Sequence, residues 1–295
     1  MRSAFSTYHP VINFGFFCAV IGTGIFIRHP VFLIIGAAAA FIYSFMLGGK
    51  GTLKFFCCFI LPMILVFTVV NSLVNPRGET VLFYTEYSQI TMESAVYGLL
   101  SGLMLAAVLL WFSCYNRIMT SDKFVYLFGR IIPAVSLIFS MVMRFVPNFK
   151  MQITRISDAQ KCIGRDISSG NWMHRARHGV KILSVMLTWA LENAIDSADS
   201  MRSRGYGLKD RSTFSIYRFD TRDRMAAGFL ALMTALVIFG AAAGRCTVEF
   251  YPSIVMADFD FLTVITCVAY LCLCFFPVAA ELKEVAAWKF SQSKI

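Results

Sequence analysis

Long apolar runs separated by short polar segments dominate the chain. Six of them are long enough to cross, or nearly cross, the ~30 Å hydrocarbon core of a bilayer. They cover residues 11–27, 31–47, 55–74, 94–114, 226–244 and 261–280. The segments between them carry glycine, proline and charge, as in "RHP" and "GGKGTLK". The pattern predicts an all-α polytopic membrane protein with about six transmembrane helices.

A different pattern fills residues 172–204, where apolar positions recur every three or four residues. This spacing is the period of one helix face, and the helical rise makes the stripe roughly 40 Å long or more. The stripe consists of Trp172, Ala176, Val180, Leu183, Leu187, Ala190, Ala194, Ala198 and Met201. Asn171 can cap the start of the helix, and Gly205 follows its last turn, where left-handed backbone suits glycine. The segment therefore predicts one long helix with defined ends.

A second long helix is expected before it, from about Pro133 to Ile163, and it also stops at a glycine, Gly164. The polar stretch "RDISSGN" then joins the two helices, so together they predict a cytoplasmic hairpin. Apolarity alone would make residues 131–149 a seventh crossing. However, Arg144 lies within that run, and a crossing would move the basic segment after it to the outside. We expect a helix lying along or shallowly under the inner face of the membrane.

Composition supports the membrane class and the charge pattern orients the chain. Hydrophobic residues make up 58% of the chain, charged residues make up 15%, and the mean hydropathy is +0.67. Of the 27 Lys and Arg residues, 14 lie within residues 149–225. Such a basic cluster can indicate nucleic-acid binding. The cytoplasmic excess of Lys and Arg that is typical of membrane proteins is the simpler interpretation. With Lys50 and Lys54 inside, Asn75–Thr91 is expected outside and both termini in the cytoplasm.

Three regions follow from this topology. Residues 1–116 are expected to hold the N-terminal transmembrane helices, and residues 117–225 the cytoplasmic coupling-helix region. Residues 226–295 are expected to form the C-terminal transmembrane helices and a cytoplasmic tail.

Catalytic and metal-binding patterns are weak. The stretch "GGKGT", residues 48–52, lacks both the leading glycine and the Ser or Thr after the lysine that a phosphate-binding loop needs. His174 and His178 have the spacing of a metal-binding pair, but "RAR" lies between them, and a solvated basic face is the simpler interpretation. The nine cysteines form no CxxC pair. We therefore expect no catalytic residue, no metal, no cofactor and no ATP hydrolysis by this chain.

Two other classes of membrane protein fit the sequence less well. A proton- or sodium-coupled carrier often keeps an ionisable group at mid-membrane, and acidic residues are nearly absent from the apolar runs. This argues against a stand-alone permease or channel, which stays the main alternative. A membrane-embedded enzyme would need clustered His, Asp or Glu at one depth, and the histidines are scattered.

The stretch "SMRSRGYGL", residues 200–208, forms a basic, glycine-stopped tip at the end of the second long helix. Ordinary C-capping explains Arg204 and Gly205, because cations are favourable beside the last unpaired carbonyls. Docking of the basic tip into a groove of a partner protein explains them equally well. The residues alone leave both interpretations open.

The order of several short motifs resembles the transmembrane T subunit of energy-coupling factor (ECF) transporters, a family of prokaryotic ABC importers for vitamins and metals. The resemblance covers nearly the whole chain. Its motifs are "YHPVINF", "NPRGETVLF", "ESAVYGLLSGLMLAAVLLW", "TSDKFVYLF", "MVMRFVPNF", "RISDAQKCIGRD" and "ADSMRSRGYG". The last two stand where the family carries two Ala-Arg-Gly signatures, each at the end of a long cytoplasmic helix.

The resemblance implies an energy-coupling subunit in a prokaryotic cell membrane. Its partners would be two ABC-type ATPases, which dock at the signatures, and a substrate-binding S subunit in the bilayer, which the long helices hold. The second signature becomes Ser203-Arg204-Gly205, with Arg204 as the anchor and Arg202 beside it. The first becomes Cys162-Ile163-Gly164, where Ile163 replaces the arginine and Lys161 and Arg165 flank it. This departure implies a weaker first contact, or two unequal ATPases.

Overall fold

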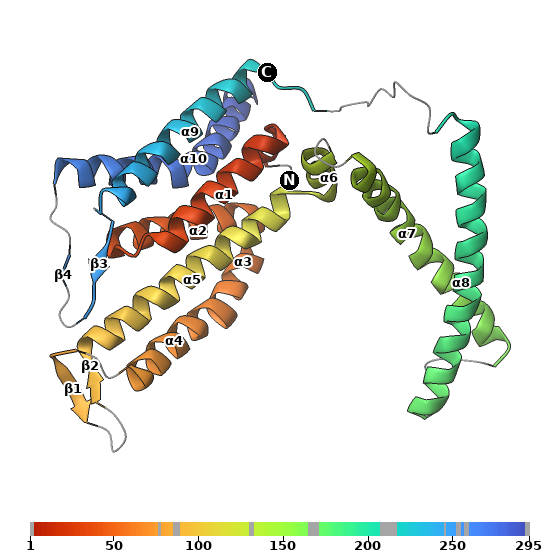
Figure 1. Ribbon diagram of the computed structural model, residues 1–295, viewed down its shortest axis with the longest axis horizontal. Coiled ribbons are helices and arrows are strands. Elements are labelled where there is room, and N and C mark those ends of the chain that lie inside the picture. The colour runs from red at the N-terminus through yellow and green to blue at the C-terminus, as the bar shows by residue number, and fades with distance from the viewer. Residues whose placement is uncertain are drawn as a thin grey trace. The chain divides into compact units, whose positions relative to one another are not determined.

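A computed structural model describes residues 3–292 except 76–77, 85–88, 130–132, 165–170, 207–216, 245, 252–254 and 257–259. The chain is almost entirely helical (Figure 1). The helices are α1 (Pro10–Phe26), α2 (Pro30–Gly48), α3 (Lys50–Phe55), α4 (Leu61–Val74), α5 (Met92–Ile118), α6 (Ser121–Gly129), α7 (Pro133–Cys162), α8 (Trp172–Ser203), α9 (Thr221–Ala242) and α10 (Phe261–Gln292). A short 3₁₀ turn, η1 (Phe5–Thr7), precedes α1, and a π-helical turn, η2 (Phe56–Ile60), joins α3 to α4.

Two small antiparallel hairpins lie between helices. β1 (Val81–Tyr84) pairs with β2 (Gln89–Thr91), and β3 (Val248–Glu249) pairs with β4 (Val255–Met256). The chain forms two compact units. One consists of Met1–Lys123 together with Tyr217–Ile295, and the other of Phe124–Ile216. We call them the membrane unit and the coupling unit.

Five helical segments of the described chain are long and apolar enough to cross a membrane: α2, the continuous Lys50–Val74 segment, α5, α9 and the Phe261–Phe290 part of α10. α1 is apolar but has 17 residues, or about 26 Å at 1.5 Å per residue. All six apolar runs of the sequence thus fall in helices, and the all-α polytopic class is confirmed. α7 is not one of the five candidate spans, and its expected place along the inner face stays a prediction.

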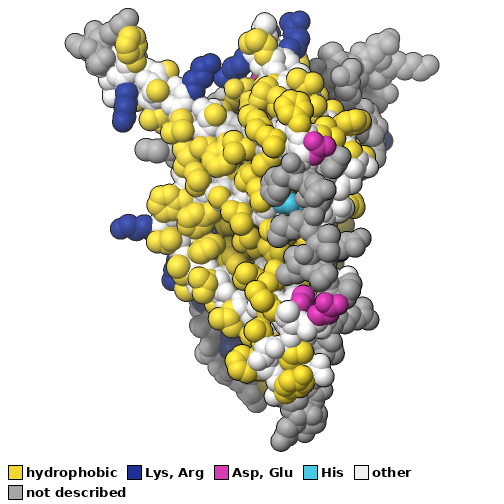
Figure 2. All heavy atoms as spheres, turned by 90° about the vertical axis from the view of Figure 1, so that its left-hand side faces the viewer, with side chains coloured by type: hydrophobic (Ala, Val, Ile, Leu, Met, Phe, Trp, Pro, Cys, Tyr) yellow, Lys and Arg dark blue, Asp and Glu magenta, His cyan; other side chains and the backbone are white. Residues whose placement is uncertain are grey.

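The surface of the molecule suits a bilayer. Figure 2 shows one face on which hydrophobic side chains cover most of the described surface, while Lys and Arg lie mainly at its margins. The Lys50–Val74 segment is the most exposed candidate span, with 6% of its apolar window buried. Such exposure would be unfavourable in water, so the apolar face requires lipid or another membrane protein.

Histidine–proline pairs begin the first two transmembrane helices. The Nδ1 atom of His9 accepts a hydrogen bond from the Val11 amide at 3.3 Å, and the Nδ1 atom of His29 accepts one from the Val31 amide at 3.3 Å. The proline after each histidine occupies the first helical position, where its missing N–H loses nothing.

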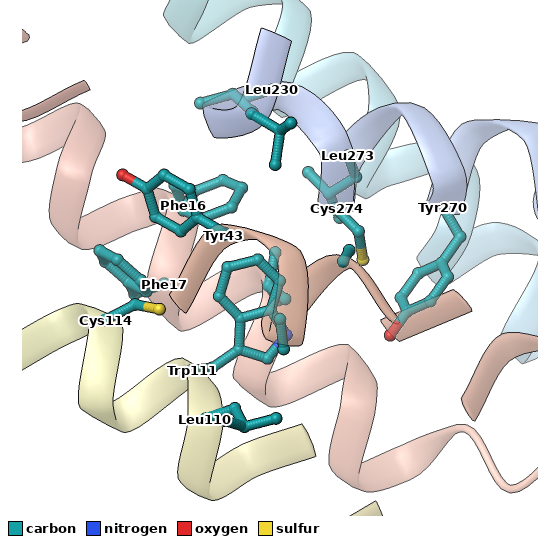
Figure 3. Packing of buried hydrophobic residues seen from close by; sticks show 14 of the residues in the cluster. Phe16, Phe17, Tyr43, Leu110, Trp111, Cys114, Leu230, Tyr270, Leu273 and Cys274 are labelled. Carbon is teal, nitrogen blue, oxygen red and sulfur yellow. The ribbon is translucent and has the colours of Figure 1, made fainter. Parts of the chain in front are cut away.

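Aromatic side chains from several helices fill the centre of the membrane unit (Figure 3). Trp111 of α5 packs against Phe16 and Phe17 of α1 and Tyr43 of α2, with ring centroids 5.6, 6.2 and 6.3 Å away. Leu273 and Cys274 of α10 are fully buried in the same cluster. This core joins α1, α2, α5 and α10 of the membrane unit.

Glycines allow α5 to pack closely against α4. A Cβ atom at Gly98 would lie 2.9 Å from the Cα of Thr68, and one at Gly102 would lie 3.1 Å from the Cα of Ile64. The small-xxx-small pair in the sequence therefore marks a real helix–helix contact, because any side chain would push the two backbones apart.

Candidate functional site: two basic helix tips

The coupling unit contains the two long helices that the sequence predicts. α7 ends at Cys162 and α8 runs from Trp172 to Ser203, within one residue of the expected ends. Asn171 is the N-cap residue of α8, and its side-chain oxygen accepts a hydrogen bond from the amide of Trp172, the first helical residue, at 2.8 Å. The helices contact each other through Phe149 of α7 and Trp189 of α8, whose ring centroids are 5.6 Å apart in an edge-to-face arrangement. The predicted hairpin of two long helices is confirmed.

Each helix stops at a glycine with left-handed backbone. The φ angle is +76° at Gly164 and +80° at Gly205. A side chain at either position would crowd the following carbonyl, so glycine is the residue that permits these turns. The two tips lie at opposite ends of α8 (Figure 1). Because α8 has 32 residues, its ends are about 48 Å apart.

The end of α8 forms a complete Schellman turn, which we call the second tip. The Tyr206 amide donates to the Met201 carbonyl at 3.0 Å, and the Gly205 amide donates to the Arg202 carbonyl at 3.0 Å. The Ser203 hydroxyl donates to the Asp199 carbonyl at 2.8 Å. The backbone of the tip is therefore fixed by its own hydrogen bonds, with Arg204 in the C-cap position.

Positive charge projects from the second tip. Arg202 and Arg204 are both exposed, and neither forms an ion pair with any residue that the structure describes. Cations beside the last carbonyls of a helix are favourable, typically by 0.3–1 kcal/mol. Both guanidinium groups remain available for carboxylates on another molecule.

The end of α7, which we call the first tip, is different. Its Lys161 already has an ion-pair partner on its own helix, Asp158, at 3.7 Å. Ile163 occupies the position of the expected anchor and is 61% exposed. Cys162 is also exposed, and Arg165 lies outside the described residues. Among the described residues, the first tip thus presents an apolar side chain where the second presents a guanidinium.

The apolar stripe of α8 does not pack against α7. The side chains of α8 that are buried in the coupling unit are Ile182 and Met186, which lie off the predicted stripe. Val180, Leu183 and Leu187 of the stripe are 66%, 66% and 61% exposed. Leu191 and Ile195 extend this exposed face to 59% and 63%. α8 therefore has two apolar sides, one against α7 and one free for another partner.

The histidine pair of α8 does not form a complete metal site. The Nε2 atoms of His174 and His178 are 3.3 Å apart. Within the described part of the chain, no group of three or more His, Cys, Asp or Glu side chains gathers there or elsewhere.

Comparison with known proteins assigns the chain to a protein family. A family model described as CbiQ, cobalt transport protein, matches residues 15–215, more than half of the chain. The chain belongs to this family. The match includes α7, α8 and both tips, and it ends before α9.

Curated relatives of this family have a consistent name. The chain is 28% identical over 201 residues to the energy-coupling factor transporter transmembrane protein EcfT of Lacticaseibacillus paracasei, covering 62% of this chain and 75% of that one. It is 26% identical over 200 residues to EcfT 1 of Listeria monocytogenes, covering 62% and 74%. It is 26% identical over 204 residues to EcfT of Lactococcus lactis, covering 64% and 76%. The resemblance to the ECF T subunit is confirmed.

Glu93 fixes the loop before α5, a role that its position in the sequence does not reveal. Glu93, at the start of α5, is 4% exposed, and its Oε1 accepts hydrogen bonds from the amide and the hydroxyl of Thr80 at 3.2 and 2.7 Å. The Ser94 hydroxyl donates to the Asn75 carbonyl. The loop in the "NPRGETVLF" motif is therefore fastened to the first turn of α5. A helix-starting Glu after a glycine-containing loop was the available signal, but it cannot specify which amides the carboxylate meets.

Proposed function

We propose that this chain is the energy-coupling transmembrane subunit of an ECF-type ABC importer. Two ABC-type ATPases dock at the helix tips, and a separate substrate-binding S subunit in the bilayer captures a vitamin or a metal ion. ATP is hydrolysed on the ATPases and not on this chain. Membership of the family, with relatives named energy-coupling factor transporter transmembrane proteins, supports this proposal.

The observation that carries the proposal is the second tip. Arg204 caps a 32-residue helix, is exposed, and forms no ion pair within the described chain. Its turn is locked by the Schellman hydrogen bonds, so the guanidinium is presented on rigid backbone. A rigid, charged end suits an acidic groove on an ATPase, where guanidinium–carboxylate bonds are charge-assisted. Movement of that ATPase on nucleotide binding would then move α8.

The free apolar side of α8 supports the other contact. Val180, Leu187 and Ile195 expose large aliphatic side chains along about four turns of the helix. We assign this side to the S subunit, because a membrane protein offers the matching apolar surface. The placement of the N- and C-termini in the cytoplasm of a prokaryotic cell follows from the Lys and Arg distribution and belongs to the same proposal.

Arg204→Glu tests the anchoring role. The variant should insert into membranes but lose co-purification with the ATPases, because truncating or reversing one partner of a desolvated ion pair costs ~3–5 kcal/mol. Arg155→Glu, an exposed arginine on α7, is the matched control and should keep the ATPases bound. Normal assembly of the Arg204 variant would refute the anchor. A chain that transports solute without any ATPase would instead support the alternative of a stand-alone permease or channel.

A further inference from the structure

The N-terminal segment contacts both places where the chain leaves and re-enters the membrane unit. The chain leaves this unit at Lys123, at the start of α6, and returns to it at Tyr217, just before α9. Residues 4–13 lie against both points. We call these residues the N-terminal plug, and the two points the outgoing and the return connection.

The plug is anchored in the core of the membrane unit by Phe5, which is fully buried. Its ring centroid lies 5.2 Å from that of Phe16, 6.4 Å from that of Tyr43 and 6.1 Å from that of Phe276. These partners come from α1, α2 and α10. Edge-to-face contacts of this kind add about 0.5–1.5 kcal/mol each to the burial of the rings. The plug therefore cannot shift without disturbing three helices.

Lys123 joins the outgoing connection to the plug. Its side chain is 6% exposed, and its Nζ atom donates to the Ser6 carbonyl at 2.6 Å. The amide of Asn13, oriented so that its nitrogen donates to the Phe5 carbonyl at 2.9 Å, accepts a second bond from Nζ at 2.9 Å. A buried ammonium group is costly unless it is hydrogen-bonded. Lys123 is therefore held in place by two oxygens of the plug.

Arg222 joins the return connection to the same plug. Its guanidinium lies over the Tyr8 ring, 4.3 Å from the centroid. It also donates to the Thr7 carbonyl at 3.4 Å and to the Thr7 hydroxyl at 3.2 Å. The His9 ring packs against Phe219, with centroids 4.9 Å apart. Two cationic side chains of the membrane unit, one before and one after the coupling unit in the chain, thus contact the consecutive residues 6–8 of one anchored segment.

We propose that the N-terminal plug is the fulcrum of energy coupling, and that Lys123 and Arg222 are positioning residues that hold both connections to it. This inference rests on the proposed function for its purpose. Work delivered to α7 and α8 reaches the membrane partner only if the points about which these helices move are fixed. A loose connection would absorb the movement in the chain segments between the two units.

The test measures how tightly the coupling unit is positioned. Spin labels on incorporated azido-phenylalanine at Glu192 of α8 and Glu284 of α10, both exposed, report the distance between the two units. The full-length chain is studied in lipid nanodiscs, alone and with its ATPases. Lys123→Met and Arg222→Gln should each at least double the width of the distance distribution relative to wild type. Lys283→Met and Arg224→Gln, which alter exposed cations of the membrane unit, are the matched controls and should leave the width unchanged.

With the ATPases bound, wild type should also show a shift of the distance on addition of ATP. The ATPases bound to Lys123→Met or Arg222→Gln should still hydrolyse ATP, but the shift of the distance should be at least threefold smaller than in wild type. A general packing defect would lower the amount of folded protein without separating hydrolysis from movement. If Lys123→Met fails to insert into the membrane, Arg222→Gln alone tests the proposal. The Arg222 side chain is exposed, so its replacement should not prevent folding.

The outcomes separate the two proposals. Wild-type widths in both variants overturn the plug as a fulcrum, whatever the ATPases do. Broader distance distributions in the two variants, measured without ATPases, support the plug as a fulcrum. Failure of wild type to bind any ATPase would refute the proposed function but not the mechanical role of the plug.

Discussion

Phe149 of α7 and Trp189 of α8 meet edge to face, with ring centroids 5.6 Å apart, and join the two long helices of the coupling unit. Met186 and Ile182, about one and two turns before Trp189 on α8, are both buried. The hairpin is therefore held by one side of α8, and its opposite side stays free. Coupling through stiff helices requires this contact to persist while the tips move.

Trp189→Ala should loosen the hairpin. The loss includes the ring–ring interaction, about 0.5–1.5 kcal/mol, and the buried area of the indole. Hydrogen exchange of the amides near Ile182 and Met186 should become faster. Trp172→Ala is the matched control, because Trp172 lies on the same helix but is 71% exposed. Equal protection in both variants would show that the aromatic contact does not hold the helices together.

Gly205→Val should damage the second tip. Valine at a φ of +80° costs roughly 1–2 kcal/mol, and a β-branched side chain is the least tolerant of that backbone. We expect faster exchange of the Tyr206 amide and weaker ATPase binding. Gly179→Ala, within α8 and with nothing within 4 Å of the position of the added Cβ, should instead stabilise the helix by about 0.5–1 kcal/mol. Unchanged exchange and binding in Gly205→Val would contradict the role of the turn.

Ile163→Arg tests the unequal tips. The exposed isoleucine leaves room for a guanidinium, so the substitution should strengthen ATPase binding at the first tip, or at least not weaken it. Quantitative co-purification with each ATPase provides the measurement, and Ile153→Arg, an exposed position in the middle of α7, provides the control. A marked loss of binding in Ile163→Arg alone would show that this tip docks through an apolar contact.

Local signals explain how much of the coupling unit could be predicted. The ends of α8 follow from residues next to them: Asn171 bonds to the first helical amide, and Gly205 allows the left-handed turn. The hydrophobic period gives the helix but not its partner. It could not show that the side of α8 with Ile182 and Met186 is the buried one, because the choice between two apolar sides depends on tertiary contacts.

The plug could not be predicted for the same physical reason. Lys123 bonds to a residue 117 positions away, and Arg222 to one 215 positions away. In the sequence, both are ordinary basic residues on the predicted cytoplasmic side of apolar runs. Charge patterning assigns them a side of the membrane, but it does not reveal which of many similar lysines and arginines is buried or bonded.

Labelling of a single cysteine tests the predicted orientation. With the native cysteines replaced, Tyr206→Cys places a thiol on the exposed second tip. A membrane-impermeant maleimide should label it in inside-out vesicles and not in intact cells, because the Lys and Arg excess places this region in the cytoplasm. A cysteine at Phe83 of the exposed β1 should give the opposite result. Labelling of position 206 in intact cells would overturn the orientation.

The buried amine of Lys123 should give wild type a distinct pH dependence of stability. Burial lowers the pKa of Lys123 to about 8, from the model-peptide value of 10.5 that applies to the unfolded chain. Between these two values the unfolded state binds more protons than the native state, so the stability of the native state rises with pH. Below about pH 8 the amine is protonated in both states, and this contribution to the slope vanishes.

Lys123→Met removes this titration. The apparent Tm of wild type should therefore increase relative to that of Lys123→Met from about pH 8 to pH 10.5, and the difference should be constant from pH 6 to 7.5. Lys283→Met, at an exposed position on α10, should follow wild type throughout. If the difference between wild type and Lys123→Met were independent of pH over the whole range, the amine would not be desolvated in the native chain. The hydrogen bonds that Lys123 donates to Ser6 and Asn13 would then be bonds of a solvated surface group, too weak to hold the outgoing connection.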